Sequence, residues 1–288
     1  MPPFFSRPVL FAAASLALAA AVVSVKFAGG SAPVDTAASA ADAEYTFGAD
    51  VPAASQDEIR HAVEATRSWL RTEAGIELPE LHVVASADRQ VLLWHYARGG
   101  PAPDRDRLLL DRWFESGGAI SSGLHVFLYT NDRWNGLDRA EREFIVAHEV
   151  FHTLEYGDAA RSGDTIPGPI WLVEGAAEYV AARVMAAQGE AGFESYVASY
   201  RARAEGLTQT LGDLDSYGRG GVAWGRRPQY TLGFLAADRL VTQSGLAAFL
   251  GVWKAMGAGA SFEGAFAAKF GEPVGRFYAA FEEDRRTR

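Results

Sequence analysis

His148-Glu149-Val150-Phe151-His152 is the stretch of the sequence that most clearly indicates a helix with functional side chains. On a helix, residues four apart project from one face on adjacent turns, so the two imidazoles can share one metal ion. Glu149 lies on an adjoining part of that surface, where its carboxylate can act as general base toward a metal-bound water. The alternative is a core helix whose histidines only form hydrogen bonds, since a pattern this short also arises by chance.

A second stretch, Trp171-Leu172-Val173-Glu174-Gly175-Ala176-Ala177-Glu178-Tyr179, carries two acidic residues at the same four-residue spacing. Burying Glu174 and Glu178 on an otherwise apolar helix face is costly unless they are paired or bind a metal. A catalytic zinc has three protein ligands and leaves its fourth position to water, so Glu174 can supply the third ligand. Glu178 can accept the second ring proton of His148. A solvated acidic edge is the alternative, and it loses weight once both helices are considered together.

The remaining sequence predicts an α+β fold, with a small N-terminal β-sheet lobe and a mainly α-helical C-terminal lobe. Runs of β-branched and aromatic residues predict strands, and apolar residues three and four apart predict helices. Asp138 and Glu141 fit a capping box at the start of the helix that carries the histidines. The predicted elements are helices over Asp57–Ala74 (stopped by Gly75), 138–156 (followed by Gly157) and 170–188, strands over Leu81–Val84 and Leu124–Thr130, and further helices from Glu194 onward.

The composition limits the classes of protein to which the chain can belong. Its 288 residues are 49% hydrophobic, which suits one enzyme-sized domain with a core of its own. The 36 acidic residues outnumber the 27 basic ones and give a formal net charge of -9, which argues against a nucleic-acid partner. The sequence has no cysteine, so any metal must be held by His, Asp or Glu.

The N-terminus has the pattern of an export signal. Arg7 precedes an apolar run over residues 8–25, with no charge before Lys26. As a helix this run would reach about 27 Å, close to a bilayer core of roughly 30 Å, so an uncleaved single-pass membrane anchor is the alternative. We therefore expect a protein that is periplasmic, extracellular or anchored to the membrane. The predicted organisation is a signal peptide or anchor (1–28), a linker rich in Ala, Ser and Gly (29–57) and one folded domain (58–288).

The two helices together resemble the gluzincins, in which HExxH is followed about twenty residues later by a ligand glutamate on the next helix. Here twenty-one residues separate His152 from Glu174, and Trp171-Leu172-Val173-Glu174-Gly175 is similar to the W-L-x-E-G segment of aminopeptidase-type gluzincins and of bacterial peptidase MA-like proteins. The resemblance covers roughly residues 120–285. It implies a zincin-like catalytic domain that binds one zinc ion through His148, His152 and Glu174 and hydrolyses peptide bonds with Glu149 as general base. In gluzincins of the thermolysin type, an acidic residue has a role similar to the one expected of Glu178, which is to contact a histidine ligand from its outer side.

The resemblance also suggests how substrate is bound. Tyr230-Thr231-Leu232-Gly233 is similar to the Y-x-x-G segment in which these enzymes place a tyrosine that stabilises the oxyanion, so Tyr230 is our candidate. The alternatives are that Tyr230 is only an amphipathic anchor at a helix start or that another tyrosine, such as Tyr217, has this role. In gluzincins the edge strand before the zinc helix pairs with the substrate. That role would fall to Leu124–Thr130, with His125, Phe127 and Tyr129 lining the cleft, although a half-buried strand without a ligand also explains these side chains.

One departure from the aminopeptidase type bears on the substrate. No G-x-M-E-N segment, the element that holds a free α-amino group in those enzymes, is present, so we expect an endopeptidase acting on peptides or proteins. Two other functions stay open at this stage. The chain could be an inactive zincin-fold binding protein of the cell envelope, or a zinc hydrolase of a non-peptide bond. The sequence does not indicate an oligomeric state.

Overall fold

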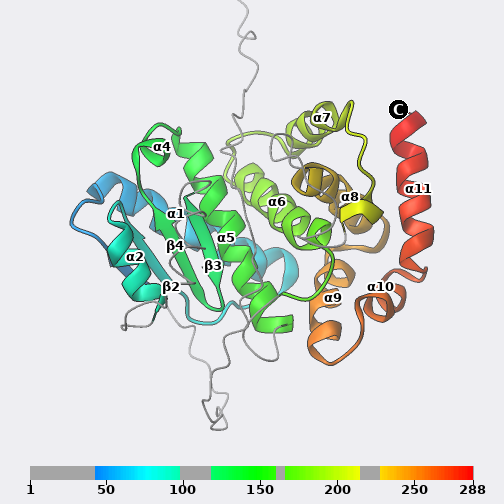
Figure 1. Ribbon diagram of the computed structural model, residues 1–288, viewed down its shortest axis with the longest axis horizontal. Coiled ribbons are helices and arrows are strands. Elements are labelled where there is room, and N and C mark those ends of the chain that lie inside the picture. Colours follow the sequence, from blue (N-terminus) through cyan, green and yellow to red (C-terminus); the bar gives the residue numbers. More distant parts are fainter. Residues whose placement is uncertain (1–42, 98–117, 160–165, 215–227, 288) are drawn as a thin grey trace, which may run out of the picture.

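The computed structural model describes residues 43–97, 118–159, 166–214 and 228–287. A four-stranded sheet near the N-terminus is followed by a mainly helical C-terminal part, which confirms the predicted α+β class (Figure 1). The predicted signal or anchor segment and the glycine-rich stretch over 217–225 lie outside the described residues. None of the helices in the described ranges combines the length and apolar character that a membrane span requires.

The sheet has the strand order β1-β2-β4-β3, with the first three strands parallel and β3 antiparallel to β4. The prediction that 124–130 forms an edge strand is therefore wrong, because β4 lies between β2 and β3. The strand at that edge is β3, which joins β4 through a tight turn where Gly123 has a φ of 59°. Four residues, three of them with small side chains, give no clear strand periodicity, so β3 could not be recognised beforehand. The strands are β1 (Glu44–Phe47), β2 (His82–Ser86), β3 (Ala119–Ser122) and β4 (His125–Tyr129).

The folded part begins earlier than predicted. Within the stretch expected to be a linker, β1 pairs with β2, and helix α1 begins at Ala53. A four-residue strand has too few residues to show alternation, and its parallel partner lies almost forty residues away, so local sequence could not reveal it. The predicted linker bounds are therefore wrong for residues 44–57.

The helices that position the site follow the prediction closely. Helix α5 (Arg139–Ala159) begins with the expected capping box, in which the backbone N–H of Asp138 donates to Glu141 and that of Glu141 donates to Asp138. The helix continues through Gly157, which is not among the glycines of positive φ, so the predicted stop there is wrong. Helix α6 spans Ile170–Ala187, as expected. The other helices are α1 (Ala53–Trp69, continued by a π-helical turn over Leu70–Ala74), α2 (Arg89–Tyr96), α4 (Asp132–Asn135), α7 (Phe193–Ala204), a 3₁₀ turn over Leu211–Leu214, α8 (Pro228–Ser244), α9 (Leu246–Gly257), α10 (Phe262–Phe270) and α11 (Val274–Thr287).

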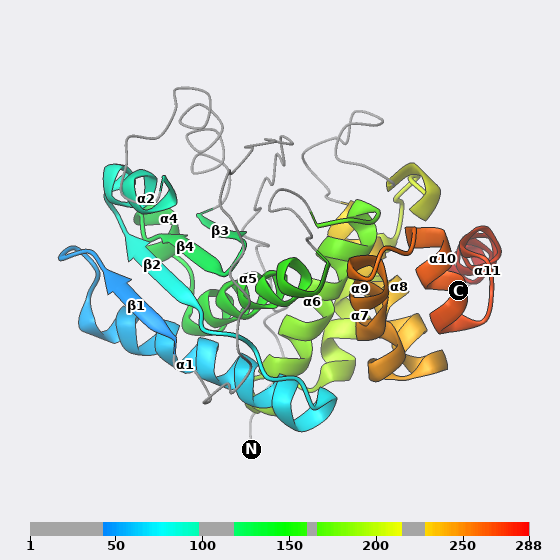
Figure 2. The same ribbon diagram turned by 90° about the horizontal axis from the view of Figure 1, so that it is seen from below.

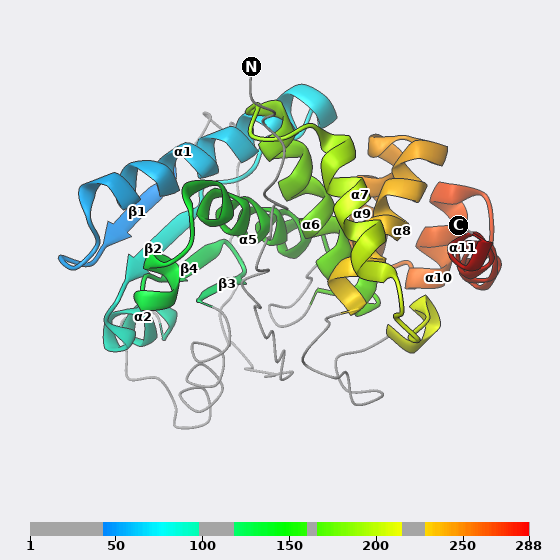
Figure 3. The same cartoon turned by 90° about the horizontal axis from the view of Figure 1, so that it is seen from above.

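Helix α5 lies between the sheet and the helical part of the molecule. The main core joins one face of the sheet, through Val83 and Val126, to α1 and α5, while Val84 and Phe127 on the other face pack against α2. Figures 2 and 3 show α1 and α2 on opposite sides of the sheet and α6 beside α5, with the C-terminal helices at the far end. The predicted site therefore lies where the two parts of the chain meet.

Helices α6 and α8 approach each other closely at two glycines. A Cβ atom added to Gly175 would collide with the backbone of Gly233, and one added to Gly233 would collide with the carbonyl oxygen of Trp171. Both contacts are with backbone, which cannot swing aside as a flexible side chain can. The fold therefore requires glycine at position 175, because the close packing of α6 and α8 brings Tyr230 of α8 toward the histidines of α5.

We expect Gly175→Ala to lower the free energy of unfolding by about 1–3 kcal/mol, because overpacking a tight contact forces the two helices apart. Urea denaturation measures this change. Gly157→Ala is the matched control: Gly157 also lies in a helix, has no neighbour within 4 Å of an added Cβ, and should be neutral or slightly stabilising on substitution. If Gly175→Ala were as stable as Gly157→Ala, the close approach of α6 and α8 would be refuted.

Candidate metal centre

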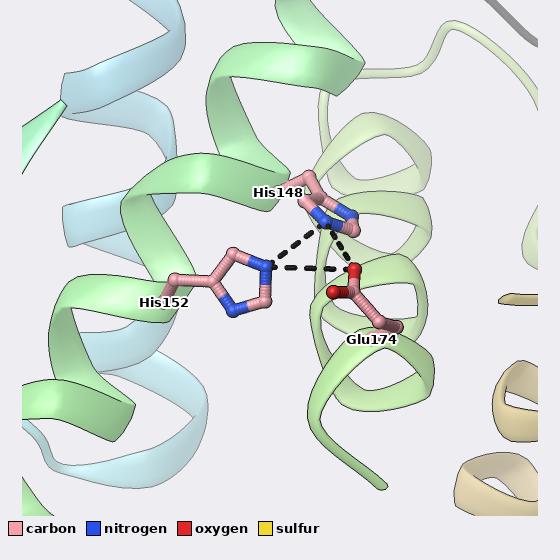
Figure 4. Close-up of side chains that lie close together, drawn as sticks. All are labelled: His148, His152 and Glu174. Carbon is pink, nitrogen blue, oxygen red and sulfur yellow. Dashed lines mark hydrogen bonds and ion pairs between the residues drawn. The ribbon is translucent and has the colours of Figure 1, made fainter. Parts of the chain in front are cut away.

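Helices α5 and α6 bring the three predicted ligands together. One ligand atom from each of His148, His152 and Glu174 lies within 4.8 Å of the other two, and all three side chains are buried (Figure 4). The two histidine Nε2 atoms are 3.1 Å apart, and Glu174 Oε2 lies 3.4 Å from His148 Nε2 and 3.8 Å from His152 Nε2. Ligand atoms around a tetrahedral zinc with bonds of about 2.0–2.1 Å are separated by about 3.3 Å. The donors and their spacing therefore fit a zinc ion.

The three groups shift one another's pKa values. Burial raises the pKa of Glu174, but hydrogen bonds from both imidazoles outweigh burial and hold its pKa well below the ordinary value. Burial lowers the pKa of His148, but its contacts with Glu174 and Glu178 outweigh that effect and raise the pKa to about 9. A metal ion requires neutral imidazoles, so metal binding at this centre would compete with protons.

Glu178 lies on the outer side of His148. Its Oε1 is 3.3 Å from His148 Nδ1, while the hydroxyl of Tyr200 donates to its Oε2. The structure thus places Glu178 beside His148, as the sequence predicts. The role of Glu178 in fixing the tautomer of His148 remains a prediction.

Glu155 makes the equivalent contact with the other histidine, and the sequence reasoning missed it. Its Oε2 lies 2.6 Å from His152 Nδ1, and the side chain is fully buried. Burial raises the pKa of Glu155 to about 7, against the opposing effect of His152. The signal in the sequence was the position of Glu155 three residues after His152. This spacing puts the two side chains on neighbouring parts of one helix face.

Glu149 is buried and is held by strand β3. The hydroxyl of Ser121 lies 2.6 Å from the backbone oxygen of Glu149 and 2.7 Å from its Oε2. Among the described residues Glu149 Oε1 is buried without a hydrogen-bond partner, which leaves it available to accept a proton. Burial raises the pKa of Glu149, despite the opposing charges of the two histidines. Ser121 could not be identified from the sequence because it lies 28 residues before Glu149 on a strand that was not predicted.

Two tyrosines lie near the centre. Tyr230, in the first turn of α8, is buried, and its ring centroid is 5.9 Å from that of His148. The structure therefore places the predicted oxyanion donor beside the candidate ligands, although its role is untested. Tyr156 was not predicted: burial raises its pKa, and the charges of Tyr96, Glu149, Glu155 and Glu174 raise it further. The alternative candidate Tyr217 lies outside the described residues.

The side chains expected to line a substrate cleft on β4 point away from this centre. Phe127 packs with Leu92 and Leu93 of α2, on the face of the sheet opposite α5, and the ring of His125 stacks on that of His82 at 4.9 Å. Side chains alternate along a strand, so Val126 and Leu128 take the face toward α5 instead. Of the two explanations for these side chains, the half-buried strand is therefore confirmed, and the lining of a cleft beside this centre by His125, Phe127 and Tyr129 is wrong.

No protein-family model matches the chain, and no curated protein matches it. Among solved structures, it is similar to the M1 zinc metallopeptidase from Deinococcus radiodurans, with 14% sequence identity and a TM-score of 0.46 over 83% of this chain and 47% of that one. A variant of that protein gives 15% identity, a TM-score of 0.48 and coverage of 83% and 48%. The variant bound to a Tyr-Ser-Ala substrate gives 15% identity, a TM-score of 0.47 and coverage of 83% and 47%. This chain thus spans about half the length of these proteins, and the likeness assigns it no activity.

Proposed function

We propose that this chain is a zinc-dependent hydrolase of peptide bonds. The observation that carries the proposal is the convergence of His148, His152 and Glu174 within 4.8 Å in a buried position, with the carboxylate of Glu149 on the adjoining residue. Burying two histidines and these carboxylates is costly unless each has a charged or hydrogen-bonding partner. A single zinc ion held by the three ligands would supply that partner. It would also explain why Glu149, a further buried acidic residue, lies beside the ligands.

The chemistry divides between the ion and the residues around it. A zinc ion in this centre would lower the pKa of a coordinated water and polarise the carbonyl group under attack. Glu149 Oε1 accepts the proton of the attacking water and then donates it to the nitrogen of the leaving amine. Its raised pKa favours the first step, because a more basic carboxylate accepts the proton more readily. The hydroxyl of Tyr230 donates a hydrogen bond to the oxyanion.

Strand β3 supports the choice of a peptide as substrate. It lies at the end of the strand order and contacts α5 through Ser121, so an extended peptide that adds to this edge would run beside the centre. Its residues are Ala119, Ile120, Ser121 and Ser122, which include no carboxylate to hold a free α-amino group. We therefore propose cleavage within peptides rather than removal of N-terminal residues.

The proposal extends to the place where the enzyme acts. The apolar run over residues 8–25 behind Arg7 supports an exported enzyme, either released into the periplasm or medium or tethered at the membrane. Its substrates would then be peptides or proteins outside the cytoplasm.

Mass spectrometry of a broad peptide mixture tests this function. The full-length chain, supplied with zinc, is expected to cut internal peptide bonds, and chelation of the metal is expected to stop cleavage. If the chain binds zinc but cuts no peptide, the peptidase proposal fails. In that case a binding protein or a hydrolase of a non-peptide bond would remain as the function of the centre.

We expect Tyr230→Phe to lower kcat by a factor of about 10²–10³ with little change in zinc content, because the variant loses one oxyanion donor and keeps the ring. Steady-state kinetics on a cleaved peptide measures the effect. Tyr179→Phe is the control, since the Tyr179 hydroxyl lies within a buried part of α6 and accepts a hydrogen bond from Arg183. An unchanged kcat for Tyr230→Phe would exclude it as the oxyanion donor.

A further inference from the structure

We infer that Glu155 is a positioning residue that orients His152 for metal binding, an inference that rests on the proposed function. The carboxylate Oε2 lies 2.6 Å from His152 Nδ1, and both side chains are buried. The contact joins residues three apart on α5. It therefore forms within one helix and does not depend on how α6 packs against it.

The contact determines which imidazole nitrogen is available to a metal. A carboxylate beside Nδ1 accepts a hydrogen bond from the Nδ1–H group, so the lone pair of the neutral ring is on Nε2. His152 Nε2 is the atom that faces the other ligands, 3.1 Å from His148 Nε2 and 3.8 Å from Glu174 Oε2. Glu155 thus selects the required tautomer and also prevents the ring from turning away from the centre.

The burial of Glu155 argues for a role other than stability. Its second oxygen, Oε1, is buried and has no hydrogen-bond partner among the described residues. A buried charged group with incomplete partners usually costs stability, and replacing a whole buried pair by apolar side chains of similar size is often neutral or stabilising. A carboxylate at this position is best explained by what it does for His152. With Glu178 at His148 Nδ1, each histidine ligand then has its own carboxylate.

Zinc affinity of the full-length chain tests the inference. We expect Glu155→Leu to raise the zinc Kd by a factor of about 10–100, the usual effect of losing such a partner, and to lower thermal stability without metal, because the buried imidazole of His152 loses its partner at Nδ1. Glu155→Gln is expected to raise the Kd less, because an amide oxygen can still accept from Nδ1 but has no charge. The absorption spectrum of the cobalt-substituted variants reports whether the ligand geometry has changed.

The matched control is Glu143→Gln. Glu143 is also a buried glutamate on α5 and also contacts a histidine Nδ1, that of His61 at 3.1 Å, but it lies outside the candidate centre. Its substitution should leave the zinc Kd unchanged. The inference is overturned if folded Glu155→Leu binds zinc as tightly as the wild type. If Glu155→Leu does not fold, an unchanged Kd for Glu155→Gln overturns it. A wild-type chain that binds no zinc would instead contradict the proposed function itself.

Discussion

Replacing Glu149 by glutamine is expected to lower the rate of peptide hydrolysis by a factor of about 10²–10⁴ while the zinc content stays that of the wild type. The amide keeps the size of the side chain and can still form a hydrogen bond with the hydroxyl of Ser121. In the wild type that hydroxyl lies 2.7 Å from Glu149 Oε2. It cannot accept a proton from the attacking water. The loss should therefore fall on kcat, with little change in KM.

Parallel zinc analysis and kinetics of the same preparation separate this effect from damage to the centre. Glu143→Gln, an equally conservative change of a buried glutamate on α5, should retain full activity. Wild-type activity in Glu149→Gln would remove the general-base assignment even if zinc is bound. A simultaneous loss of zinc would show that Glu149 acts on the metal centre rather than on the proton.

Replacing Glu174 by glutamine is expected to weaken zinc binding at least about a hundredfold, since even residues that only orient a ligand contribute about 10–100-fold. The change removes the one anionic ligand and leaves two imidazoles, whose nitrogens are 3.1 Å apart, with a neutral amide. Competition with a chelator of known affinity measures the Kd. The same variant should also lose the thermal stabilisation that zinc gives to the wild type, because a ligand stabilises only the state that binds it.

Glu178→Gln provides the comparison, because Glu178 contacts His148 from the outer side, 3.3 Å from Nδ1, and is not one of the three converging ligands. Its effect on the zinc Kd should be smaller than that of Glu174→Gln. Equal Kd values for Glu174→Gln and the wild type would contradict the assignment of Glu174 as a ligand.

The parts of this molecule that could be predicted are those encoded locally. Helices α5 and α6 are long and periodic, and the four-residue spacing of their histidines and acids places those side chains on common faces before any packing is known. The capping box of α5 and the stop at Gly75 are also local signals, and the structure has both. The convergence of the three ligands then needs only that the two helices pack together.

The parts that could not be predicted depend on contacts between distant segments. Strands β1 and β3 are four residues long and acquire their identity from partners elsewhere in the chain. Ser121 reaches Glu149 only because β3 packs beside α5, and Gly175 is required only because α8 crosses α6 at that point. Glu155 is different, because its position three residues after His152 on α5 is a local feature of the sequence.

The zinc content of the purified full-length chain tests the central claim most directly. Elemental analysis after dialysis against buffer without chelator should find one zinc ion per wild-type chain and none in His148→Ala combined with His152→Ala, with both proteins folded by circular dichroism. Folded wild-type chain without zinc, even after zinc is supplied, would contradict the account. So would a double variant that retains one zinc ion per chain.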